Sequence, residues 1–160
     1  MTVIAFVIAL LATPYVGLVI AESYTSVSGT IEFTSVTPAG PPKVAGKSDN
    51  RIRIFNIIED WSGDIEGTGI AKARWIIHNA PLMDNPDAWV NAYAIITFSD
   101  VVVLGRSGSL TIKLVLSEAE GAGHWTIMEG TGELANIHGQ GFGSIATEPF
   151  TYTGMVHFDP

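Results

Sequence analysis

The sequence lacks cysteine altogether. This absence excludes disulfide bonds, thiolate metal sites, thiol nucleophiles and a lipid-modified cysteine anchor. Basic residues are also scarce, because eight Lys and Arg stand against 16 Asp and Glu, which gives a formal net charge of −8. Binding to nucleic acid or to an anionic membrane surface needs clustered Lys and Arg, so we expect neither as a partner.

The sequence also lacks a complete nucleotide-binding motif and a recognised metal-binding motif. The glycine-rich stretch GTGELANIHGQGFG at residues 130–143 resembles a dinucleotide-binding loop, but such a loop requires a long helix after the glycines. Here β-type sequence and Pro149 follow. The histidines are spaced neither as H-x-H nor as H-E-x-x-H. The sequence therefore predicts no cofactor and no metal site.

The N-terminus carries a long apolar run. Residues 3–21, VIAFVIALLATPYVGLVIA, contain no charged side chain and end in a V-x-A pattern at Ala21, which is typical of a secretory signal with its cleavage site. We expect a secreted, extracytoplasmic protein with residues 1–21 as signal peptide and residues 22–160 as a single domain. The alternative is a retained membrane anchor, because the run is nearly long enough to span a bilayer. Only in that case is a membrane expected as a partner.

Beyond the apolar run, alternating and β-branched stretches are separated by Gly, Pro, Asn and Asp clusters, as expected for strands. No stretch shows sustained helical periodicity. The pattern predicts strands at residues 23–36, 51–61, 65–78, 90–104, 109–118, 124–129, 141–149 and 150–159. Eight strands joined mostly by hairpins indicate an antiparallel up-and-down barrel or a sandwich. The barrel is favoured because it removes exposed edges and suits long strands.

Three ordered motifs carry a family resemblance. They are WSGDIEGTG at residues 61–69, GRSGSL at 105–110 and WTIMEGTGELANIHGQG at 125–141. Together they resemble the uncharacterised family called domain of unknown function 3224, whose members are similar to allene oxide cyclase-like barrels and, more distantly, to dirigent proteins. The resemblance implies an all-β, eight-stranded antiparallel calycin-like barrel, and it brings no catalytic residues with it. The loop at residues 78–91 looks longer than is usual for the family.

Aromatic side chains are the candidates for lining the barrel. They alternate with small or polar residues along the predicted strands. The candidate ligand-binding residues are Trp75, Tyr93, Phe98 and Trp125. A cavity above roughly 300 Å³ beside Trp75 or Trp125 would favour ligand binding. A filled interior with an apolar outer strand would favour assembly with a neighbour.

Polar residues near predicted turns are candidates for the barrel rim. These are Glu66, Arg106, Glu133 and His138. Asp64 and Glu66 share a strand face, a spacing that permits acid–base work. We expect them to join a cross-strand ion-pair ladder with Lys72 and Arg74 instead.

Two hypotheses follow from the sequence. In the first, a secreted barrel binds a small apolar ligand in its interior and guides cofactor-free cyclisation or dirigent-like coupling. In the second, the barrel is a non-enzymatic extracellular or envelope module that self-associates through its apolar surface. Whether a reaction is catalysed stays open at this point.

Overall fold

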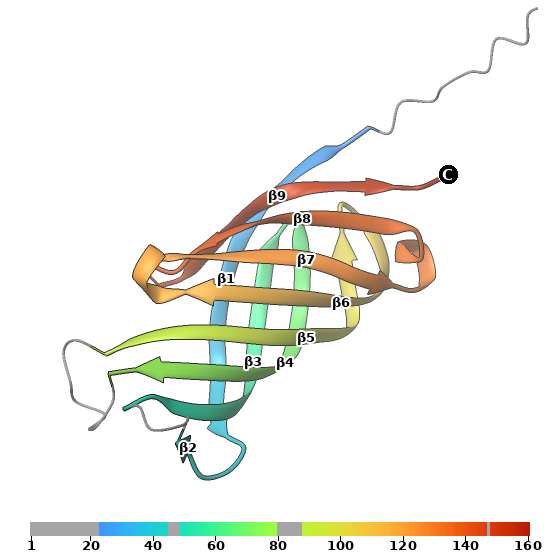
Figure 1. The fold of residues 1–160 in the computed structure, drawn as a ribbon. Coiled ribbons are helices and arrows are strands. Elements are labelled where there is room, and N and C mark those ends of the chain that lie inside the picture. The colour runs from blue at the N-terminus through green and yellow to red at the C-terminus, as the bar shows by residue number, and fades with distance from the viewer. Residues whose placement is uncertain (1–22, 45–48, 80–87, 147) are drawn as a thin grey trace, which may run out of the picture.

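The computed structural model describes residues 23–44, 49–79, 88–146 and 148–160. It contains nine strands and two 3-10 turns among these residues (Figure 1). They are β1 (Thr25–Pro38), β2 (Lys43–Val44), β3 (Arg51–Gly63), β4 (Ile65–His78), β5 (Trp89–Val103), β6 (Arg106–Ser117), η1 (Glu118–Glu120), β7 (Ala122–Gly130), η2 (Gly132–Leu134), β8 (Ile137–Ser144) and β9 (Phe150–Phe158).

The strands close into an antiparallel barrel. From β3 to β9 each strand pairs with the next along the chain, β9 pairs with β1, and β1 pairs with β3. Eight strands thus form the closed barrel, and β2 is an extra strand on β3. The predicted all-β, eight-stranded antiparallel barrel is confirmed. The predicted N-terminal segment lies outside the described residues. Among the described residues, no helix is long and apolar enough to cross a membrane.

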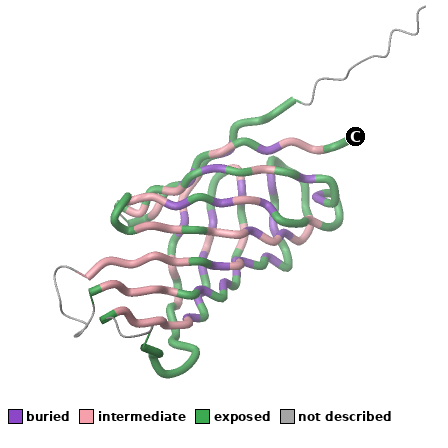
Figure 2. Tube along the Cα trace, in the orientation of Figure 1, coloured by how far each residue is buried: buried purple, intermediate pink, exposed green. Residues whose placement is uncertain are grey.

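Antiparallel connection gives the barrel two different ends. One end holds the tight β3–β4 and β5–β6 turns and η2, and we call it the turn end (Figure 1). The opposite end holds η1, and we call it the loop end. Buried residues alternate with exposed ones along the strands, as Figure 2 shows, because successive side chains point to opposite faces of the barrel wall.

Large aromatic side chains fill the interior toward the turn end. The Trp61 ring contacts Phe98 edge-on at 5.7 Å and Tyr152 at 4.8 Å between centroids. The Tyr152 hydroxyl accepts a hydrogen bond from the buried Ile65 N–H at 2.8 Å. This part of the interior is therefore a packed core, as is usual for a small barrel.

The glycine-rich stretch at residues 130–143 is only partly a turn. Its first half forms η2, but its second half belongs to β8, which begins four residues before the predicted strand at residues 141–149. The inner side of β8 and β9 carries Gly141 and Gly154, where an added Cβ would collide with the Trp125 ring. These glycines thus make room for a large core side chain. The long loop expected at residues 78–91 lies mostly outside the described residues.

Candidate functional site

A cavity of about 230 Å³ lies inside the barrel toward its loop end and is partly open to solvent. It is lined by residues from the end of β4, the start of β5, the end of β6, the start of β9 and the middle of β1 and β3. The antiparallel order brings these strand portions to the same end. The cavity therefore occupies the half of the barrel that the aromatic core leaves empty.

Four alanines on two neighbouring strands create this space. Ala71 and Ala73 of β4 and Ala92 and Ala94 of β5 all line the cavity. Ala73 pairs directly with Ala94, and Ala92 pairs with Trp75. Methyl groups at adjacent inward positions cannot fill the interior of an eight-stranded barrel. The cavity is thus encoded by small residues where other inward positions carry Ile, Phe or Leu.

The rest of the wall is apolar and partly aromatic. The Trp75 ring packs against Phe55 at 4.6 Å, and Phe33 meets Phe150 edge-on at 5.0 Å. Leucines of β6 close one side. A mostly apolar concavity with a few polar groups is the usual form of a small-molecule site.

Glu59 is the buried polar group of the cavity. It lies on the inner face of β3 between Ile57 and Trp61, lines the cavity, and is only 2% exposed. Burial raises its pKa from 4.5 to about 7 because the ionised form loses its hydration. The nearby Trp61 indole lowers the pKa in part. The contact falls short of full hydrogen-bond geometry, because Glu59 Oε1 and Trp61 Nε1 are both buried without a hydrogen-bond partner among the described residues.

Polar residues mark the loop end of the barrel. Glu118 lines the cavity, and its Oε2 accepts a hydrogen bond from the Val90 N–H at 2.8 Å. The His78 and Trp89 rings stack at 3.8 Å across the ends of β4 and β5, and the Asn91 side chain lies 3.4 Å from His78 Nε2.

The predicted lining residues divide into three groups. Trp75 lines the cavity. Phe98 and Trp125 are buried, at 0% and 1% exposure, and do not line this cavity, but Trp125 borders the larger hollow described below. Tyr93 is 45% exposed on the outer face, so its predicted placement in the lining is wrong. Its neighbours Ala92 and Ala94 line the cavity instead, because alternate residues of a strand face opposite sides.

The predicted rim residues lie toward the turn end, away from the cavity. The Arg106 guanidinium sits 3.9 Å over the Phe158 ring. Glu133 Oε2 accepts a hydrogen bond from a backbone N–H at the start of β6, at 2.9 Å. His138 Nε2 lies 3.1 Å from Asp159, and Glu66 is exposed at the start of β4. The structure therefore does not bring these four together with Trp75 or Glu59.

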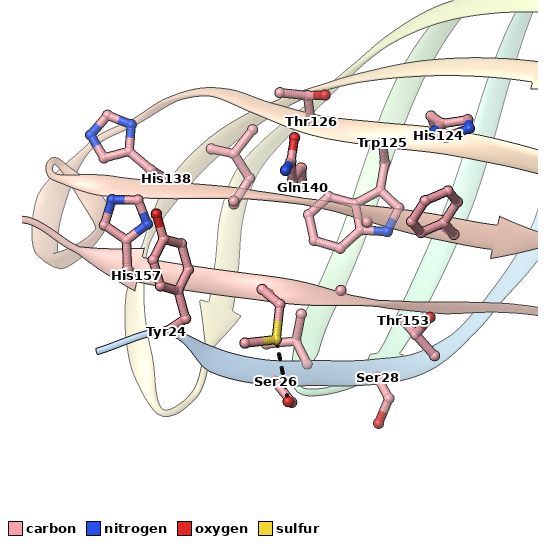
Figure 3. A pocket seen from close by; sticks show the side chains of 17 residues that line it. Tyr24, Ser26, Ser28, His124, Trp125, Thr126, His138, Gln140, Thr153 and His157 are labelled. Atoms are coloured by element: carbon pink, nitrogen blue, oxygen red, sulfur yellow. Dashed lines mark hydrogen bonds between the residues drawn. The ribbon is translucent and has the colours of Figure 1, made fainter. Parts of the chain in front are cut away.

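A larger hollow, of about 890 Å³, lies on the outer side of β1, β7, β8 and β9 (Figure 3). His138 and His157 stack at 5.1 Å at one end, where both contact Asp159, and Ser26 donates to the Met155 sulfur at 3.4 Å. Among the described residues no group of three His, Asp or Glu is placed to hold a metal ion. This hollow is lined mainly by exposed side chains, with the buried Val27 and Trp125 among them, whereas the interior cavity holds a buried acid. The interior cavity is therefore the stronger candidate site.

Sequence reasoning missed Glu59, although a signal was present. In IFNIIEDW, residues 54–61, every second side chain from Phe55 to Trp61 belongs to one strand face, and Glu59 falls on that face. An acid on an otherwise apolar strand face points to a buried carboxyl. Because Asp60 follows Glu59 directly, the two acids were interpreted as one exposed charged pair, and the different strand faces of the two side chains were overlooked.

The fold is shared with a solved structure of a protein of unknown function from the DUF3224 family from Shewanella oneidensis MR-1. The two structures have a TM-score of 0.69 and 18% sequence identity, over 86% of this chain and 99% of that chain. A pyocyanin demethylase matches with a TM-score of 0.45 and 19% identity, over 82% of this chain and 99% of its own. No protein-family model and no curated protein matches the sequence. The predicted likeness to allene oxide cyclase-like and dirigent-like barrels stays a prediction, and what the comparison establishes is that this chain has the fold of the DUF3224 protein.

Proposed function

We propose that this chain is an exported barrel of the DUF3224 family that binds a small apolar ligand in its interior cavity. The observation that carries the proposal is the interior apolar cavity created by the four alanines beside Trp75. Its volume of about 230 Å³ falls below the roughly 300 Å³ expected above for a ligand site, which is where drug-sized sites begin. The ligand we expect is therefore smaller, in the range of a substituted single ring, since an apolar cavity of about 150 Å³ already binds benzene.

Glu59 gives such a site its chemistry. A carboxyl whose pKa is raised to about 7 exchanges a proton readily near neutral pH. Cofactor-free cyclisation or coupling of a bound ligand would use this group as proton donor. The supporting observation is that Glu59 lines the cavity and is almost completely buried.

Ethylbenzene provides a direct test of binding. We expect calorimetric titration to show saturable binding, accompanied by a change in tryptophan emission that Trp75→Phe reduces. Ala94→Leu should weaken ethylbenzene binding because its larger side chain takes up part of the cavity, whereas Val115→Ala, on the outer face of β6, should leave the affinity unchanged. Equal binding by the Ala94→Leu variant would place the ligand elsewhere and contradict the proposal.

A second candidate function is assembly, and it is favoured by one outer-face feature. Tyr93, Val115, His124 and Phe142 are in register across β5, β6, β7 and β8, and the three apolar members are 45%, 47% and 58% exposed. Such an exposed row is a possible self-association surface. Sizing of the mature protein decides this point, since a strict monomer at high concentration would contradict assembly through this row.

A further inference from the structure

Two ionisable side chains are found among the described residues that line the cavity, and both are acids. Glu59 lies deep in the cavity and Glu118 lies at the loop end. An anionic ligand would meet like charge without a cation in the lining to pair with it. Arg51 and Arg53 continue the alternation of β3 beyond Phe55, but they do not line the cavity. The electrostatics of the lining therefore favour a basic ligand over an acidic one.

The buried end of the cavity also has an unmet hydrogen-bonding requirement. Glu59 Oε1 has no hydrogen-bond partner among the described residues. Leaving a buried polar atom unpaired costs free energy, and a ligand group that pairs with it recovers that cost. A purely apolar ligand would fill the space and leave Glu59 unsatisfied. A ligand that carries one nitrogen base would satisfy both the apolar wall and the carboxyl.

Resting on the proposed ligand-binding function, we propose that Glu59 makes the interior site selective for weak organic bases. The ligand class is an amine or nitrogen heterocycle with a small apolar body and its nitrogen directed at the Glu59 carboxyl. Carboxylic acids of the same shape are rejected. The aromatic walls formed by Phe33, Trp75 and Phe150 support the same selectivity, because aromatic faces attract cations.

Proton sharing makes this pairing favourable inside the barrel. The pKa of Glu59 is about 7, which is close to the pKa of a weakly basic heterocycle. The proton can then reside on either partner, and the pair carries no net charge in both forms. Burial of an unpaired charge, which would cost several kcal/mol, is thus avoided. A single hydrogen bond joins the two groups in either form.

The neighbouring titratable groups do not obscure this pairing. Asp60 accepts a hydrogen bond from Thr68, Glu32 and Lys72 are exposed, and Glu118 is exposed at the loop end. Inside the barrel, burial raises the pKa of Tyr152 to about 12, so that its phenol is neutral. Glu59 is therefore the buried titratable group among the described residues that line the cavity.

Three probes with the same ethyl-substituted ring test the selectivity: ethylbenzene, 4-ethylpyridine and 4-ethylbenzoate. In calorimetric titrations of the full chain near neutral pH, we expect 4-ethylpyridine to bind about tenfold more tightly than ethylbenzene, the gain typical of a hydrogen bond to a charged group. We expect 4-ethylbenzoate to bind more weakly than both. Glu59→Leu should keep ethylbenzene binding and remove the preference for the pyridine.

The pH profile distinguishes hydrogen bonding to Glu59 from a merely structural role. In the wild type the affinity for 4-ethylpyridine should peak between the pKa of the pyridinium and that of Glu59, and it should fall on the alkaline side as Glu59 loses its proton. Glu59→Gln, which cannot ionise, should lose this alkaline fall. If ethylbenzene binds but 4-ethylpyridine binds no more tightly, or if 4-ethylbenzoate binds more tightly than both, the proposed selectivity is contradicted. The proposed ligand-binding function is not contradicted by either result. If ethylbenzene and 4-ethylpyridine both fail to bind, the proposed function is contradicted and the selectivity with it.

Discussion

Glu59 couples the stability of the barrel to pH. Its pKa is raised from 4.5 to about 7 because it is buried. The unfolded chain therefore releases the proton at lower pH than the native state does, and the free energy of unfolding falls as pH rises from about 4.5 through 7. The contribution of the protonated Glu59 to the free energy of unfolding is fully present below about pH 4.5 and is lost above about pH 7. The sign is opposite to that of a salt-bridged carboxylate, which is stabilising at high pH.

Glu59→Gln isolates this effect, because glutamine mimics the protonated acid and does not titrate. The difference in the free energy of unfolding between variant and wild type should change in favour of the variant by about 2 to 3 kcal/mol between about pH 5 and pH 8. Urea unfolding at both pH values measures it, and histidine titration cancels in the difference. A constant difference across this range would show that the carboxyl is hydrated in the native state.

At the scale of the strand, the barrel is packed unevenly. Ala94 of β5 faces empty space, whereas Gly154 of β9 faces the Trp125 ring and the Gln140 carbonyl. Added volume should therefore have opposite consequences at these two positions. Ala94→Leu enters the cavity, but a Cβ at Gly154 meets atoms that are already close-packed.

We expect Ala94→Leu to change the free energy of unfolding by less than about 1 kcal/mol and Gly154→Ala to lower it by about 2 kcal/mol or more. Ala94→Leu adds more volume than Gly154→Ala, yet we predict that it destabilises the barrel less. Thermal or urea unfolding of both variants at one pH measures the contrast. If Ala94→Leu proved the more destabilising variant, the cavity would have to be smaller in solution than in the structure.

Strand positions were predictable from sequence, but strand faces were not. Alternation along residues 109–118 and Gly and Pro clusters between the strands mark the strands because both depend on local backbone geometry. On β5 the outward Tyr93 is the larger apolar residue and the inward Ala92 and Ala94 are small, so apolar character alone assigns the wrong face. Large apolar residues usually face the interior, but the lining of a cavity needs small residues, so this rule fails on β5.

At the scale of the whole molecule, the two ends of the barrel differ in how their interior is filled. The turn end holds the Trp61–Phe98–Tyr152 core, and the loop end holds the cavity and Glu59. The sequence predicted closure into eight strands, and that prediction is confirmed. It could not predict the cavity, because the space depends on which residues of distant strands become neighbours across the interior.

Among the described residues, the strand pairings that close the barrel all fall between Thr25 and Phe158. Removal of residues 1–21 should therefore leave the barrel intact, as export with cleavage after Ala21 would require. We expect a chain of residues 22–160 to show the same β-type circular dichroism and, within about 0.5 kcal/mol, the same free energy of unfolding as the full chain in detergent. Mass spectrometry of the secreted protein should find Glu22 as its first residue. A mature protein that begins at Met1 would instead support the retained membrane anchor, and a truncated chain that fails to fold would show that residues before Glu22 stabilise the barrel.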